Sequence, residues 1–237
     1  MSTFTLTHPT LGHITVTERS GSGKISARWT SGQLKVNIPA GLSSRRIADT
    51  IERHAADFER IRPRPRYHPG TIIPIPATDI TISILPAPGI TRLTLTVPTT
   101  GRFNILLPPS ADTADPAIQS AIDTAVKAIA RRIAPAILLP RARQLASNLG
   151  LGVDRWEIAH GMNVLGTCYP RQRRIRLSFL NVFLTPELRD YIIHHELAHL
   201  SCPGHTPEFH SLCDRYCGGR ERILIRLLHS YPWPVER

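Results

Sequence analysis

The chain has 237 residues, of which 41% are hydrophobic, and its formal net charge is +11. This length supports one large domain or two small ones around a hydrophobic core, and the composition excludes a disordered chain. Apolar runs are far shorter than the ~20 residues that cross a bilayer, and the N-terminus lacks the basic and apolar regions of a signal peptide. We therefore predict a cytoplasmic protein with no membrane partner.

The positive charge comes almost entirely from arginine. A basic surface favours acidic or phosphate-bearing partners, so the arginine excess predicts a weak affinity for nucleic acid or phosphate. The arginines are spread along the chain and form no single basic run. The four cysteines lack paired C-x2-C motifs, which excludes a zinc ribbon and predicts free thiols.

Strands are predicted first along the chain. Residues 34–38 alternate hydrophobic and polar side chains, which is the period of a half-buried strand. The stretch SGSGK at 20–24 is interpreted as a hairpin turn, because it lacks the spacing of a phosphate-binding loop. A helix is expected over residues 43–61. The proline-rich residues 62–109 are then predicted to hold at least three short strands.

Helices dominate the rest of the chain. Asp115 and Pro116 are typical of a helix N-cap and first helical position, and a hydrophobic stripe of helical period follows them. Another helix is expected to end at Gly150, with Pro140 marking its bend or its start. Residues 172–180 are predicted to form a strand.

Two later helices begin with the same signature. Thr-Pro-Glu at 185–187 and again at 206–208 places a capping threonine before a proline at the first helical position. The order of elements predicts an α+β fold. It has a β-rich N-terminal region at 1–110 and a mainly helical domain with a short sheet at 111–237.

The first of these helices carries the sequence H-E-L-A-H at 195–199. Residues four apart lie on one face of a helix about one turn apart, so His195 and His199 can bind one metal ion through their imidazole nitrogens. Glu196 projects beside them, where it can take a proton from a metal-bound water without being a ligand. The motif therefore predicts a catalytic zinc (Zn²⁺) site with Glu196 as general base.

A catalytic zinc needs a third protein ligand and an open position for water. His205, in the turn before the next helix, is predicted to be that ligand, and His210 within that helix is the alternative. The gap from His199 to His205 matches the metzincin spacing. However, Cys202 occupies the position of the metzincin glycine, and no methionine follows the motif. The metzincin class is therefore excluded.

Several stretches of the chain resemble the YgjP-like family of metal-dependent hydrolases, which are zincin-like and related to SprT-like proteins. These stretches are LGTC at 165–168, RRIRLSFL at 173–180, TPELRDYIIHHELAHL at 185–200 and GHTPEFH at 204–210. The resemblance implies that 111–237 is a zincin-like metal-dependent hydrolase domain. It also implies that the three histidines His195, His199 and His205 bind zinc and that Glu196 is the catalytic base. The chain departs from the family pattern at Leu165, Gly204 and His210, and these departures bear on the shape of the substrate pocket.

We therefore predict a zinc-dependent metallopeptidase that hydrolyses a peptide or protein substrate through a zinc-bound water activated by Glu196. Arg174, Arg176 and His210 are predicted to contact the substrate, and RRIRLSFL to be the edge strand along which it lies. The donor that stabilises the oxyanion is left open among Tyr191, Tyr216, His210 and Arg176.

Two other functions remain as alternatives. The first is a metal-dependent phosphoanhydride hydrolase, such as a nucleoside triphosphate pyrophosphatase, which the arginines near residue 174 would suit. The second is a binding module with a structural zinc. A closed structural site would not need Glu196 and usually contains cysteine ligands, so this alternative is the weaker one.

Overall fold

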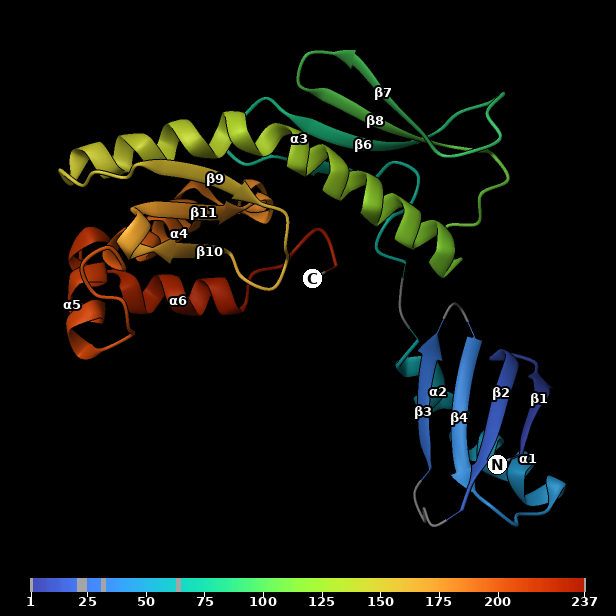
Figure 1. Cartoon of the computed structure of the whole chain (residues 1–237). Coiled ribbons are helices and arrows are strands. Elements are labelled where there is room, and N and C mark those ends of the chain that lie inside the picture. The colour runs from blue at the N-terminus through green and yellow to red at the C-terminus, as the bar shows by residue number, and fades with distance from the viewer. Residues whose placement is uncertain (1, 21–24, 31–32, 63–64, 237) are drawn as a thin grey trace. The chain divides into compact units, whose positions relative to one another are not determined.

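The computed structural model describes residues 2–20, 25–30, 33–62 and 65–236. These residues form two compact units (Figure 1). The first unit comprises Met1–His68 and Ser110–Ala121, and the second comprises Pro69–Pro109 and Ile122–Arg237. The turn predicted at 20–24 lies, apart from its first residue, outside the described residues.

The first unit is built on a four-stranded sheet. Its strands are β1 (Thr3–His8), β2 (Gly12–Arg19), β3 (Ser26–Thr30) and β4 (Gln33–Pro39). Their order is β1-β2-β4-β3, with β2 and β4 parallel and the outer pairs antiparallel. The alternation predicted for 34–38 is confirmed, because Leu34, Val36 and Ile38 are buried and the residues between them are not.

Two helices cover one face of this sheet (Figure 1). They are α1 (Ser44–Arg53) and α2 (Ala55–Arg60), so the single helix predicted over 43–61 is interrupted at His54. The hydroxyl of Ser43 caps α1 by accepting the backbone N–H of Arg46. Ile47 and Ile51 of α1 and Phe58 of α2 join the strand residues in one hydrophobic core.

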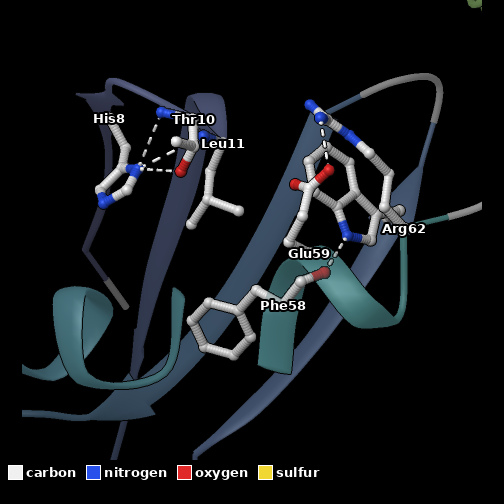
Figure 2. Close-up of polar contacts among 7 residues, drawn as sticks. His8, Thr10, Leu11, Phe58, Glu59 and Arg62 are labelled. Atoms are coloured by element: carbon white, nitrogen blue, oxygen red, sulfur yellow. Dashed lines mark hydrogen bonds and ion pairs between the residues drawn. The ribbon is translucent and has the colours of Figure 1, made fainter. Parts of the chain in front are cut away.

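Polar contacts hold α2 and the β1–β2 turn in place (Figure 2). The indole N–H of Trp29 donates to the carbonyl of Phe58 at 2.8 Å. Arg62 lies over the same indole, with its guanidinium carbon 4.3 Å from the ring centre, and also donates to Glu59. In the turn, Nδ1 of His8 accepts two backbone N–H groups, which closes the hairpin.

The second unit begins with a sheet of the same topology. It contains β5 (Ile72–Pro74), β6 (Thr81–Pro86), β7 (Thr94–Thr99) and β8 (Arg102–Leu107), in the order β5-β6-β8-β7. Its central strands β6 and β8 are again parallel, and its outer pairs are antiparallel. Each sheet is followed in the chain by a helix, so the two units share one strand-and-helix pattern.

The helix after this sheet is α3 (Pro116–Asn148), which runs for 33 residues. Its predicted start is confirmed, because the side chain of Asp115 accepts the N–H of Ala117 at 2.8 Å. The predicted second helix is wrong, since α3 continues through both Pro135 and Pro140. Buried residues along its length pack α3 into the second unit, where it lies along two sheets (Figure 1). This packing offsets the backbone hydrogen bonds that the prolines remove.

A second, three-stranded sheet and three helices complete the unit. The strands are β9 (Arg155–Ala159), β10 (Gly166–Tyr169) and β11 (Arg174–Ser178), and the helices are α4 (Pro186–Ala198), α5 (Pro207–Tyr216) and α6 (Glu221–His229). The predicted α+β fold, with strands first and a mainly helical region after them, is confirmed. The sheet order is β10-β11-β9. The strand expected at the sheet edge, β11, is therefore central, and β10 is an edge strand.

Candidate active site

Helix α4 carries the H-E-L-A-H motif on a firmly packed scaffold. The hydroxyl of Thr185 accepts the N–H of Leu188, and Pro186 occupies the first turn, as the sequence predicts. Ile193 and Leu197 are fully buried and hold the helix in the core. The helix ends at Ala198, with His199 as its C-cap in helical conformation. The i,i+4 relation between the two motif histidines is therefore kept.

Three imidazoles converge at the end of this helix. Ring nitrogens of His195, His199 and His205 all lie within 4.8 Å of one another. The Nε2 atoms of His195 and His205 are 3.1 Å apart. Two imidazole nitrogens bound tetrahedrally to one zinc at about 2.0–2.1 Å lie about 3.4 Å apart, so the donor set fits a zinc ion with one position left open. His205 is exposed and His195 and His199 are partly buried, so the group of imidazoles is accessible from solvent.

The surroundings of His195 and His199 favour the neutral form of the imidazole, which is the form that binds metals. Nδ1 of His199 donates a hydrogen bond to the carbonyl of Cys202 at 3.0 Å. The lone pair on Nε2 of His199 is therefore free to bind a metal. Burial, and then the neighbouring imidazoles, lower the pKa of His195 to about 4. Burial also lowers the pKa of His199. The buried ring of Phe209 packs against all three imidazoles at centroid distances of 4.4 to 4.9 Å.

Glu196 is buried beside the three imidazoles, with 5% of its surface exposed. Burial raises the pKa of its carboxyl to about 8, and the backbone N–H of Cys168, which donates to it, acts in the opposite direction. This hydrogen bond ties the carboxylate to the edge strand β10. Gly166 of the same strand lies against Glu196 so closely that a β-carbon there would be 2.6 Å from the Cγ and Cδ atoms of the glutamate.

A cavity of about 1050 Å³ opens over these side chains. It is lined by residues of the 162–170 segment, of α4, of the turn containing Pro203 and His205, and of the C-terminal end of the chain. Met162, Val164, Leu165, Ile192 and Trp233 make much of its wall apolar. Of the lining residues, all of which the structure describes, none is lysine, arginine or aspartate. Glu196 is the acidic group among them.

The predicted substrate contacts lie elsewhere. Arg174 and Arg176 do not line the cavity, and both approach Glu157 on β9, at 3.7 and 3.5 Å. His210 is not among the lining residues either, and its Nδ1 lies 3.0 Å from the buried carboxylate of Glu221. The substrate-binding roles of these three residues stay predictions.

The two tyrosines predicted as candidate oxyanion donors differ in their position relative to the cavity. Tyr191 lines the cavity, and burial raises the pKa of its hydroxyl, which keeps it a hydrogen-bond donor. Tyr216 does not line it and instead packs near His194. His194 also lies 3.9 Å from the sulfur of Cys217. His194 therefore has neighbours other than the three converging imidazoles.

Sequence reasoning missed three contributors to this site, namely Gly166, Phe209 and Trp233. Gly166 and Phe209 both lie in stretches that carry the family resemblance, LGTC and GHTPEFH, which is the signal that could have found them. Trp233 has no such signal, because it lies 23 residues after the last of those stretches.

A helix with the H-E-x-x-H sequence and a third imidazole beside it defines the class of metal-dependent peptidases. A family model for the YgjP-like metallopeptidase domain matches residues 24–228, and the chain belongs to this family. The expected family is thus confirmed, and with it a metal-dependent peptidase acting on a peptide or protein. A search of curated proteins found no match, and neither did a search of solved structures. No described helix is long and apolar enough to cross a membrane.

Proposed function

We propose that the chain is a zinc-dependent peptidase in which His195, His199 and His205 hold the zinc and Glu196 is the general base. The observation that carries this proposal is the convergence of three ring nitrogens within 4.8 Å of one another under an open cavity. Zinc is the metal proposed because three histidine ligands with one open position are an arrangement found in catalytic zinc sites. Three neutral ligands leave the double charge of the ion uncompensated, which suits catalysis.

Zinc bound at this site would supply a Lewis acid for the attack of water on a peptide carbonyl. The remaining chemistry belongs to Glu196. Its carboxylate accepts the proton that the attacking water loses, and it then returns that proton to the nitrogen of the departing amine. The Cys168 N–H holds the carboxylate in position and favours its ionised form. The positive charge of a bound zinc ion would favour the ionised form further.

The substrate backbone has a natural partner in the edge strand β10. This strand pairs with β11 on one side only, so the groups on its other edge are free of the sheet. The Cys168 N–H reaches Glu196 from this strand, and Gly166, Thr167 and Cys168 line the cavity. An extended peptide that adds to this edge brings its carbonyl close to Glu196 and the three imidazoles.

The phosphoanhydride alternative is not favoured. Arginine and lysine are the side chains that most often bind phosphate groups, and none of the residues lining the cavity, each within the described chain, is lysine or arginine. A purely structural zinc is also disfavoured, because it would not require a buried glutamate beside an open cavity.

Two measurements test the proposal together. Protein purified without chelator is expected to contain about one zinc per chain. Glu196→Gln is expected to keep the zinc, because the imidazoles are unaltered, and to lower turnover by ~10² or more, the usual worth of a general base. Casein, a peptide library and nucleoside triphosphates serve as parallel substrates.

The matched control is Glu187→Gln, which removes a partly exposed carboxylate from the first turn of the same helix. This variant is expected to retain full turnover. If Glu196→Gln instead hydrolyses the substrate at the wild-type rate, Glu196 is not the base and the proposal fails.

A further inference from the structure

The end of the chain forms part of the active-site cavity. Leu228 and His229, from the last turn of α6, and Trp233, from the segment after it, all line the cavity over Glu196. The family match ends at residue 228, so Trp233 lies outside the matched range. The contribution of Trp233 to the cavity wall is therefore a feature of this chain that the family match does not account for.

Contacts on both sides of Trp233 hold this segment in place. Before it, the hydroxyl of Tyr231 donates to the carbonyl of Phe183, and the Tyr231 ring packs edge-on against the indole at 5.2 Å. After it, Val235 is 1% exposed, and the N–H of Glu236 donates to the side chain of Asp123 at 2.9 Å. Trp233 is thus held as a fixed part of the cavity wall.

Other residues of the cavity wall are apolar, as Trp233 is. Met162, Val164 and Leu165 come from the segment between β9 and β10, and Ile192 comes from α4. Val164 is 56% exposed, so its side chain is accessible to a substrate in the cavity. Besides the three imidazoles and Glu196, the polar lining residues are Asn163, Thr167, Cys168, Tyr191 and His229. None of the lining residues, all within the described chain, is lysine, arginine or aspartate, so a charged substrate side chain has few partners here.

We infer that this apolar part of the cavity binds a large hydrophobic side chain of the substrate next to the scissile bond, and that Trp233 determines this specificity. The inference rests on the proposed peptidase function. An indole supplies a large, rigid apolar contact surface. Burying a leucine or phenylalanine side chain against it is expected to favour such substrates about tenfold or more over alanine.

Binding to the zinc-loaded Glu196→Gln variant tests this inference without turnover. The probes are blocked pentapeptides of alanine in which the central residue is Phe, Leu, Ala, Lys or Asp. The Phe and Leu peptides are expected to bind about tenfold more tightly than the other three. Adding Trp233→Ala should remove most of this preference, whereas adding Trp233→Phe should preserve it, because a ring still fills the position.

Leu227→Ala is the matched control, since Leu227 is 44% exposed on α6 and does not line the cavity. Zinc content and thermal unfolding of every variant show whether the fold is intact. The inference is overturned if the five peptides bind equally, if none binds, or if Trp233→Ala with normal zinc content keeps the preference.

Hydrolysis by the wild-type protein separates this inference from the proposed function. If the Phe and Leu peptides bind preferentially but are not cleaved, the binding of a hydrophobic side chain against Trp233 stands and the peptidase function fails. If peptides are cleaved by a Glu196-dependent reaction without regard to the central residue, the function stands and the role of Trp233 is rejected.

Discussion

The contact between Gly166 and Glu196 shows how little space surrounds the proposed base. A β-carbon at residue 166 would lie 2.6 Å from the glutamate Cγ and Cδ atoms and closer still to Oε1, which no real contact allows. Because Glu196 is buried and bonded to the Cys168 N–H, it cannot move aside without losing that bond. The absence of a side chain at residue 166 is thus part of the site.

Gly166→Ala is therefore expected to displace the carboxylate and to lower kcat about tenfold or more, because small displacements of catalytic groups have large effects on rate. Zinc content should not change, since the imidazoles are not touched. The comparison is Gly161→Ala, where a β-carbon meets no atom within 4 Å. Equal kcat values for the two variants would show that the contact is unimportant.

Substitution of each candidate histidine tests which residue is the third zinc ligand. Ring nitrogens of His205 belong to the converging group, whereas His210 is held by Glu221 at 3.0 Å. We expect His205→Ala to lose most of the zinc and His210→Ala to retain it, as measured by elemental analysis after dialysis. The reverse result would make His210 the ligand.

Among the elements, α4 depends on a buried arginine for its position. Arg189 is 6% exposed and donates hydrogen bonds to the carbonyl oxygens of Asn181, Val182, Leu184 and Pro76. Burial lowers the pKa of its guanidinium. The side chain thus joins the helix that carries the motif to the turn before it and to the loop containing Pro76.

Arg189→Met retains the length of the side chain but removes every donor. The buried carbonyls would then lack partners, so the free energy of unfolding is expected to fall by about 3 kcal/mol. Urea unfolding of the zinc-free protein measures this change. Arg222→Met, at an exposed position of α6, should change the stability by less than about 0.5 kcal/mol. A similar small effect at Arg189 would mean that water satisfies these carbonyls.

At the scale of the whole molecule, we propose that the chain divides near residue 110 into a β-rich region and a hydrolase domain. Proline and polar residues cluster at 62–80 and 108–116. Two of the three junctions between the compact units, at 68/69 and 109/110, also fall within these stretches, and the third lies at 121/122. Low concentrations of proteinase K are expected to cut first within one or both stretches, and mass spectrometry of the fragments identifies the positions. Protection of both stretches would indicate one fused core.

The assignment of the chain as a peptidase rests on the family match, which covers residues 24–228. The weak affinity for nucleic acid or phosphate and the cytoplasmic location stay predictions. Arginines on the three-stranded sheet are partly occupied by Glu157, which approaches Arg155, Arg174 and Arg176.

The features that the sequence determined by itself are local ones. The spacing of His195 and His199 follows from helix geometry, and the threonine caps at 185 and 206 begin their helices as predicted. His205 also joins the group through a short turn after the helix. Each of these arrangements depends on residues within about ten positions, where backbone geometry and capping decide the outcome.

Only the tertiary structure decided which surfaces meet. Strand β11 became central and β10 an edge because strand order depends on pairing between distant segments. Helix α3 continues through two prolines because packing on the rest of its unit outweighs a local preference to stop. Gly166 lies against Glu196, and Trp233 reaches the cavity, through contacts across 30 residues or more. Such contacts arise from burial of distant side chains in one core, which no local pattern encodes.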